Sequence, residues 1–243
     1  MIDGAIKKQA CGNYFWCFQL EKAEWEKLIN SLVKLGVLHS PKIIKVMLNL
    51  PRSKFLPADQ QSYSDKDTPL PIGFGQIISA PNIVAMINEA LHLEVGHKVL
   101  EIGAGSGWHA ATMAELVASK DVPRSEWGHV YTVEIIQVLA EAARKNIMNT
   151  GYGDRVTIVN ADGSNGYPEK APFDRIVVTA AAREVPQPLL NQLKDKGIVM
   201  IPIGDLALFQ KLVMLTRDDD GNIRQENLGE VAFVPLTGKY SES

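Results

Sequence analysis

The sequence has few cysteines, no long apolar run and no excess of positive charge. Its 243 residues include only Cys11 and Cys17, which excludes a disulfide framework. Their spacing is not that of a metal site, so we expect free thiols and a cytoplasmic protein. No apolar run is long enough to predict a membrane span. With a formal net charge of −3, the chain has no excess of basic residues to bind a polyanion, so a nucleic-acid partner is not expected.

The overall composition is that of an ordinary globular protein, with 46% hydrophobic and 22% charged residues. One structural domain is expected, because two domains of half this length would each have a thin core. We also expect a monomer. Within the domain we distinguish a leader of unknown role (residues 1–19), an N-terminal helical region that contributes to the active site (20–95) and an α/β core (96–243).

The sequence of the N-terminal region predicts three helices. Apolar residues recur at helical spacing from Leu20 to about Val37. Ser40 followed by Pro41 is typical of an N-cap and first helical position, and opens a second helix that ends before Pro51. The proline-rich stretch 57–75 predicts a loop, and a third helix is expected over 81–93.

After Gly96, short β-rich runs alternate with helical patterns, which predicts βαβ units. The expected fold class is α/β, with a doubly wound, mostly parallel sheet and an antiparallel C-terminal edge. The predicted strands are 98–103, 129–135, 155–161, 173–180 and 197–203, the helices 108–117, 137–150 and 188–194, and the antiparallel strands 211–216 and 231–236, joined by a turn at 218–222.

A glycine-rich loop joins the first of these strands to the first of these helices. Strand residues 99–102 lead directly into Gly103-Ala104-Gly105-Ser106-Gly107, and the helix begins at Trp108. Such a loop lets a ligand approach the backbone at the carboxyl edge of the sheet, so we expect a nucleotide-containing cofactor. A tight turn without a ligand is the alternative.

The spacing of the glycines separates two cofactor classes. A dinucleotide site has glycine at positions 1, 3 and 6 of the loop, and the sixth position here is Trp108, which argues against a nicotinamide dehydrogenase. The Glu-x-Gly-x-Gly-x-Gly pattern instead resembles motif I of class I S-adenosylmethionine-dependent methyltransferases. The expected cofactor-binding residues of this segment are Glu101, Gly103, Ala104, Gly105, Gly107 and His109, of which His109 can also simply occupy the first helical turn.

Acidic residues follow the next two predicted strands. Glu134 can accept hydrogen bonds from both hydroxyls of a ribose, and Asp162, followed by Gly163, can accept one from an adenine amino group. An exposed strand-end acid and ordinary Asp-Gly turn chemistry are the respective alternatives. The five histidines show no metal-ligand spacing, so no metal is expected.

Six blocks of the sequence belong together: 51–52 with 55–57, 69–81, 99–107, 162–169 with 171–174, 179–182 with 185–186, and 234–237. In this order they resemble the protein-L-isoaspartate O-methyltransferase family, over roughly residues 25–238. The resemblance implies methyl transfer from S-adenosylmethionine, with S-adenosylhomocysteine as product, to the α-carboxylate of L-isoaspartyl residues in damaged proteins.

The resemblance also assigns site residues. Ser79 becomes the catalytic and substrate-contacting residue, although a serine at this place can also be a helix N-cap. Thr179 joins the cofactor-binding set. Backbone amides near Ala180 to Ala182 are expected to orient the isoaspartyl carboxylate. The implied substrate-binding residues are Ser79, Ile77, Ala180, Ala181, Ala182 and Thr237.

Two positions depart from the family pattern. Ile77 stands where the family usually has threonine, and Asn82 stands where histidine is frequent. Neither change touches the glycine loop. The alternatives are therefore a class I methyltransferase with an RNA or small-molecule substrate, and a non-catalytic paralogue that binds S-adenosylmethionine.

Overall fold

The computed structural model describes residues 14–204 and 209–241. The chain divides into two compact units, residues 1–86 and 87–243, and the division falls inside helix α4 (Pro81–Ala90). No helix in the described residues is long and apolar enough to cross a membrane.

The predicted leader, residues 1–19, is partly helical. Helix α2 (Tyr14–Lys34) begins inside it, ahead of the start that the apolar spacing indicates. Residues 1–13, with Cys11, lie outside the described residues, as does the side chain of Cys17. The predicted free thiols and the predicted division of the chain therefore stay predictions.

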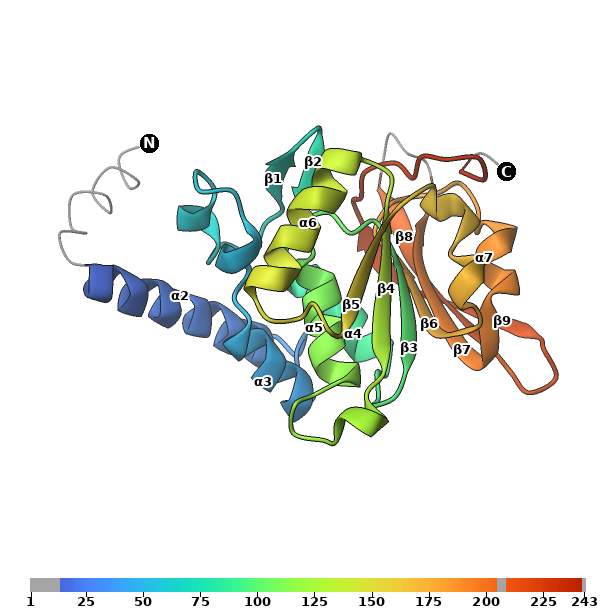
Figure 1. Cartoon of the computed structure of the whole chain (residues 1–243), viewed down its shortest axis with the longest axis horizontal. Coiled ribbons are helices and arrows are strands. Elements are labelled where there is room, and N and C mark those ends of the chain that lie inside the picture. The colour runs from blue at the N-terminus through green and yellow to red at the C-terminus, as the bar shows by residue number, and fades with distance from the viewer. Residues whose placement is uncertain (1–13, 205–208, 242–243) are drawn as a thin grey trace. The chain divides into compact units, whose positions relative to one another are not determined.

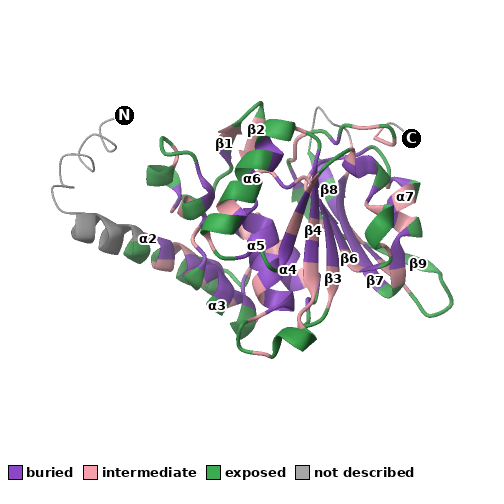
Figure 2. Cartoon of the chain, viewed as in Figure 1, coloured by how far each residue is buried: buried purple, intermediate pink, exposed green. Residues whose placement is uncertain are grey.

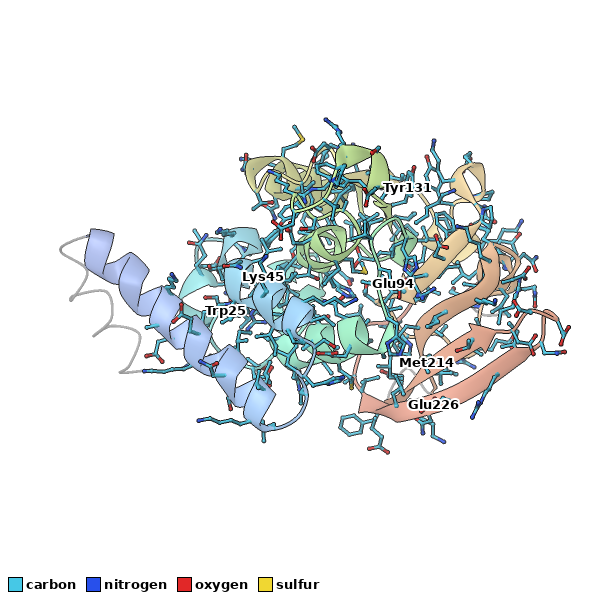
Figure 3. The ribbon with its side chains drawn as sticks, turned by 90° about the horizontal axis from the view of Figure 1, so that it is seen from below. Trp25, Lys45, Glu94, Tyr131, Met214 and Glu226 are labelled. Atoms are coloured by element: carbon cyan, nitrogen blue, oxygen red, sulfur yellow. The ribbon has the colours of Figure 1, made fainter. Side chains whose placement is uncertain are left out.

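The first unit holds α2 against α3 (Pro41–Asn49). The indole nitrogen of Trp25 donates a hydrogen bond of 2.7 Å to the carbonyl oxygen of Met47, and Figure 3 shows Trp25 on the α2 side that faces α3. Ile29 and Trp25 are buried on the same helix. The predicted second helix is confirmed, but Ser40 makes no side-chain cap hydrogen bond.

The segment predicted as a loop contains a β-hairpin, so that part of the prediction is wrong. Strands β1 (Leu70–Gly73) and β2 (Gln76–Ile78) pair antiparallel, with Leu70 opposite Ile78, and both of these side chains are buried. Pro71 obscured the strand in the sequence, but proline is tolerated in a two-stranded sheet, where every strand is an edge. Short 3-10 turns precede the hairpin: η1 (Arg52–Phe55) and η2 (Gln61–Tyr63).

The second unit contains a seven-stranded sheet of order β5-β4-β3-β6-β7-β8-β9. The pairs from β5 to β7 are parallel, and β8 and β9 add an antiparallel edge, which confirms the predicted doubly wound α/β class. The strands are β3 (Lys98–Ile102), β4 (His129–Glu134), β5 (Val156–Asn160), β6 (Phe173–Val178), β7 (Leu193–Ile203), β8 (Gln210–Arg217) and β9 (Ile223–Val231).

Helices cover both faces of this sheet. α5 (Trp108–Val117) and α6 (Gln137–Asn149) lie on one face and α7 (Gln187–Asn191) on the other (Figure 1). Because both faces are covered, the central strands are almost continuously buried (Figure 2), which accounts for their uninterrupted apolar runs in the sequence.

Two predicted elements near the C-terminus are misplaced. The helix expected over 188–194 ends at Asn191, because Leu193 already pairs with Phe173 as the first residue of β7. The last strand was predicted over 231–236, but the chain reverses at Asp218 and returns at once as β9. Most of its side chains are exposed, and they lack the apolar alternation of a half-buried strand; Figure 3 shows Glu226 on this outer strand.

A buried arginine holds the loop before β4 in place. Arg155 lies over the rings of Tyr152 and Trp127, at 4.4 Å and 5.2 Å from their centroids. Its Nη1 donates 2.7 Å to the carbonyl oxygen of Ala118 and 3.1 Å to the carboxylate of Glu115. The loop before β4, which carries Trp127, thereby contacts a buried charge that is itself hydrogen-bonded to Ala118 and Glu115.

We expect Arg155→Ala to lower the free energy of unfolding by about 3 kcal/mol, because it leaves buried acceptors without a donor. Arg124→Ala is the matched control: Arg124 lies 5.5 Å from the same Trp127 ring but is 75% exposed. Its loss should cost less than about 1 kcal/mol. Urea unfolding of both variants checks the difference, and equal costs would show that burial of Arg155 does not matter.

Candidate active site

The glycine loop turns where the order of the strands reverses, at the carboxyl ends of β3 and β6. Gly103 has a φ of 98°, and a Cβ added there would collide with the hydroxyl oxygen of Thr179. Gly107 has a φ of 85° and is the N-cap of α5 without any side chain. The loop therefore needs glycine for its backbone angles and, at Gly103, for space.

Thr179 fixes this loop from the neighbouring strand. Its hydroxyl donates to the carbonyl oxygens of Ile102 (3.0 Å) and Gly103 (2.8 Å). The Ile102 carbonyl also accepts the backbone N–H of Thr179 (2.9 Å), so the hydroxyl adds a side-chain bond to this backbone pairing and extends it to Gly103. Thr179 acts on the shape of the loop, and direct contact with a cofactor stays a prediction.

A buried acid lies beneath the loop. Glu101 accepts a hydrogen bond of 2.6 Å from the hydroxyl of Thr132. Nδ1 of His109 is 3.1 Å from Oε1 of Glu101, which is ion-pair distance, but the angle is not that of a hydrogen bond. Within the described residues, Oε1 of Glu101 and Nε2 of His109 have no hydrogen-bond partner. A buried carboxylate with an open acceptor suits a cationic ligand group, as a methyl-donating sulfonium is.

Glu134 organises the other side of the loop. Its carboxylate accepts hydrogen bonds from the backbone N–H of Gly105 (2.9 Å) and of Ile136 (3.0 Å), and the side chain is buried. The exposed-acid alternative is therefore wrong. Each carboxylate oxygen accepts one N–H and keeps further lone-pair capacity, so the predicted acceptance of ribose hydroxyls remains compatible with the geometry.

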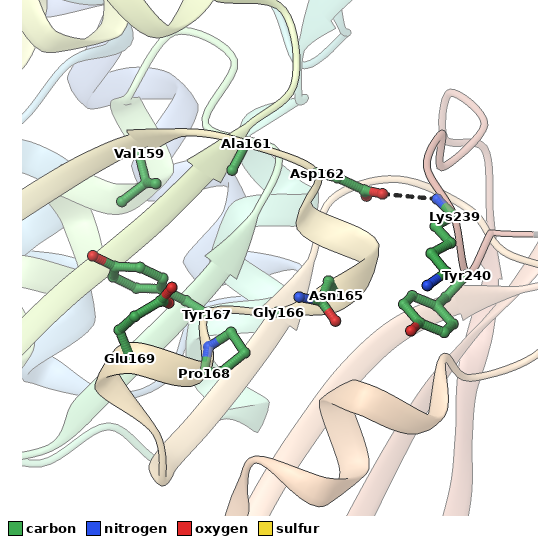
Figure 4. Close-up of a pocket in the computed structure, with 10 residues that line it drawn as sticks. All are labelled: Val159, Ala161, Asp162, Asn165, Gly166, Tyr167, Pro168, Glu169, Lys239 and Tyr240. Carbon is green, nitrogen blue, oxygen red and sulfur yellow. Dashed lines mark hydrogen bonds between the residues drawn. The ribbon is translucent and has the colours of Figure 1, made fainter.

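Asp162 joins the end of β5 to the C-terminal tail. Oδ1 accepts from the N–H and hydroxyl of Ser164, as the cap of η4 (Gly163–Asn165), and Oδ2 accepts from the N–H of Lys239 at 2.7 Å. The predicted turn chemistry is thus present. Figure 4 shows the bond to Lys239 beside a pocket of about 350 Å³ that Asp162 lines together with Tyr167. Binding of an adenine by Asp162 stays a prediction.

These bonds set the protonation of Asp162. Burial would raise its pKa, but the hydrogen bonds from Lys239 and Ser164 outweigh burial and hold the pKa below the ordinary value of 3.8. A carboxyl group whose pKa is lower in the folded state stabilises the fold above its unfolded pKa. That contribution is lost as the pH falls through the lowered value.

We therefore expect Asp162→Asn to be less stable than the parent at pH 5 to 7, because the amide nitrogen cannot accept from Lys239. The difference should shrink as the pH falls below about 4, since the protonated acid resembles the amide. Urea unfolding of both proteins at several pH values measures it. A difference that does not change with pH would contradict this role of the Asp162 charge.

In the first unit, Ser79 lies two residues before the start of helix α4, and its hydroxyl does not cap the helix. The carbonyl of Ala80 accepts from Ile83 and Val84, so Ala80 and not Ser79 is the N-cap. The carboxylate of Asp67, from the loop ahead of β1, accepts the N–H of Asn82 (2.9 Å) in place of a capping side chain. The N-cap alternative for Ser79 is wrong, and its half-buried side chain is available for another role.

Arg52 determines the shape of the chain around Ser79. The buried guanidinium donates only to backbone carbonyls, one of them that of Ser79 at 3.1 Å. Burial lowers the pKa of Arg52 to about 10, although Asp67 and Asp65 oppose the shift, so the group stays charged at neutral pH. The other acceptors are the carbonyls of Tyr63, Ser64, Lys66 and Thr68.

The alanine segment after β6 differs from expectation. The N–H of Ala181 donates to Val234 (2.7 Å) and that of Ala182 to Pro202 (3.0 Å), so neither is free to orient a carboxylate. The N–H of Ala180 has no backbone acceptor among the described residues. The other predicted substrate-binding positions are the exposed Thr237 and the half-buried Ile77, which pairs with Pro71 in the hairpin.

Within the described residues, no group of three or more His, Cys, Asp or Glu side chains could hold a metal ion. The sequence did not single out Asp67, and it presented Arg52 only as part of a family block. Their partners lie too far along the chain for a local pattern to reveal them.

Comparison with known proteins identifies the family. The family model of protein-L-isoaspartate(D-aspartate) O-methyltransferase matches residues 23–241. This chain belongs to that family. A protein-L-isoaspartate O-methyltransferase of Hyperthermus butylicus is 52% identical over 214 residues, which are 88% of each chain. One of Staphylothermus marinus is 48% identical, over 89% of this chain and 95% of the relative.

Solved structures agree with this assignment. A protein-L-isoaspartate O-methyltransferase of Plasmodium falciparum, solved in complex with S-adenosyl-L-homocysteine, has a TM-score of 0.76 and 26% identity, and the match covers 88% of this chain and 98% of that one. Another member of the family has a TM-score of 0.77 and 33% identity, over 89% of this chain and 67% of that one. The fold that carries the glycine loop is thus that of a methyltransferase family.

Proposed function

We propose that this chain transfers the methyl group of S-adenosylmethionine to the α-carboxylate of L-isoaspartyl residues in damaged proteins. The family match over residues 23–241 is the observation that carries the proposal. The glycine loop, the open acceptor of Glu101 and the carboxylate of Glu134 fit the donor, because they offer backbone space, a negative charge and ribose acceptors.

The reaction needs alignment more than proton transfer. A carboxylate with a pKa near 4 is ionised at neutral pH, so the acceptor needs no general base and no metal. S-adenosylmethionine supplies an electrophilic methyl group on a good leaving group. The contribution of the protein is then to fix the carboxylate oxygen in line with the bond that breaks. Methylation also gives the carbonyl carbon a methoxy leaving group. The neighbouring peptide nitrogen can then attack this carbon and release methanol, which forms a succinimide and opens the route to repair.

We assign the orientation of the acceptor carboxylate to Ser79. Asp67 caps α4 instead of Ser79, and Arg52 fixes the Ser79 carbonyl, so the hydroxyl can donate to a ligand without loss of a helix cap. The amides of Ala181 and Ala182 are already bonded and are left out of this assignment.

We further propose a cytoplasmic monomer that acts on protein rather than nucleic acid. The net charge of −3 supports a partner other than a polyanion. The edge strand β9 supports the monomer, because its exposed charged side chains disfavour extension of the sheet by a second copy.

The decisive experiment offers the protein two peptides that differ only at one residue, L-isoaspartate or L-aspartate. Methyl transfer from labelled S-adenosylmethionine should occur on the isoaspartyl peptide and be at background on the other. Binding of S-adenosylhomocysteine, measured by calorimetry, is the control for folded protein. Cofactor binding with no preference for the isoaspartyl peptide would refute the substrate and favour an RNA, a small molecule or no turnover.

Ser79→Ala should lower kcat/KM for the isoaspartyl peptide by about tenfold to a hundredfold, the effect of losing one hydrogen bond to a charged group. Affinity for S-adenosylhomocysteine should change little. Ser53→Ala, which removes another half-buried hydroxyl of the same unit, is the matched control and should stay within about twofold. Equal kinetics for the two variants would remove Ser79 from the reaction.

A further inference from the structure

The turn of the β1–β2 hairpin contains a residue that its turn type disfavours. Gly73 pairs with Gln76, so Phe74 and Gly75 are the central residues of a two-residue turn. Their φ angles are 56° and 73°. A turn with positive φ at both positions is of type I′, for which Asn-Gly is the preferred pair. Phenylalanine is a poor choice at the first position, because a bulky side chain at positive φ is strained.

Packing does not account for the phenylalanine either. Its side chain is 61% exposed, whereas Leu70 and Ile78 of the same hairpin are buried. The ring therefore contributes little to the core and occupies a conformation that asparagine would adopt with less strain. An exposed aromatic ring at a strained turn is expected where the ring binds another molecule.

We propose that Phe74 contacts an apolar side chain of the substrate, several residues away from the isoaspartyl residue. The inference rests on the proposed function, because it takes Ser79 as the place of the isoaspartyl carboxylate. Strand β2 leads from the turn to Ser79, and an extended chain rises about 3.3 Å per residue, so the steps from Gln76 to Ser79 span roughly 10 Å, with Phe74 beyond them in the turn. A substrate segment in the same extended form has the same rise.

The expected partner is thus a residue about three to five positions from the isoaspartyl residue, on one side of it. Damaged segments differ in sequence, and an aromatic face suits such a substrate because it binds many apolar side chains without a fixed hydrogen-bond pattern. The contact would favour long, locally unfolded substrates over short ones.

The test uses three isoaspartyl peptides: a short one with two flanking residues on each side, and two long ones extended on the N-terminal or the C-terminal side by a segment with leucine at the third to fifth positions. For the parent protein, at least one long peptide should have a KM about fivefold lower than the short one, from partial burial of the ring. Phe74→Asn should remove that advantage and raise Tm by about 2–4 °C, because the strain is relieved.

Two further variants make the result specific. Phe74→Tyr keeps the ring and should keep the advantage of the long peptide. Leu35→Asn removes a side chain that is 73% exposed, in the same unit and without a positive φ, and should change neither Tm nor the peptide preference. A rise in Tm together with a loss of peptide preference cannot come from a merely structural ring, whose removal would lower Tm.

Three results would overturn the proposal. An unchanged ratio of long to short peptide in Phe74→Asn overturns it, as does a parent protein with no preference for either long peptide. A weaker affinity for S-adenosylhomocysteine in Phe74→Asn also overturns it, since the ring would then serve the cofactor. If the parent methylates none of the isoaspartyl peptides, the proposed function itself has failed.

Discussion

The turn from β3 into α5 is the constraint on which the carboxyl edge of the sheet depends. The chain must turn where the strand order reverses, and it does so because Gly103 leaves the space that the Thr179 hydroxyl fills. That hydroxyl in turn holds the carbonyls of Ile102 and Gly103. Two neighbouring strands therefore fix the loop, and its backbone groups are presented by a rigid element, as a precise binding site requires.

Two acidic residues at this edge of the sheet accept hydrogen bonds from backbone N–H groups of the chain itself. Glu134 holds the N–H of Gly105, and Asp162 holds that of Lys239 from the C-terminal tail. A carboxylate oxygen that accepts one N–H keeps lone pairs for a second donor, so organisation of the loop and recognition of a ligand are compatible. Glu101 differs, because its buried Oε1 lies 3.1 Å from Nδ1 of His109 but has no hydrogen-bond partner among the described residues, so it keeps acceptor capacity for a cationic ligand group.

The parallel sheet and the glycine loop could be predicted because local sequence determines them: buried strands give apolar runs, and a tight βα turn needs glycine. The hairpin was missed because Pro71 argues against a strand, and β9 because an exposed edge strand has no apolar alternation. Arg52 was not recognised as a site residue, since its acceptors are scattered along the chain. Likewise, no local pattern indicates that Ala181 is bonded to Val234.

The hairpin and the turn after it concentrate departures from local rules: a proline in a strand, phenylalanine at positive φ, and alanine at a helix N-cap just after a serine. The rest of the unit compensates for them. The Asp67 carboxylate replaces the missing cap, and the Arg52 guanidinium satisfies the carbonyls that the irregular chain leaves open. Because Asp67 and Arg52 stabilise this loop from distant positions, the Ser79 hydroxyl is not needed for its stability. The residues that stabilise the loop are therefore different from the residue proposed to act on the substrate.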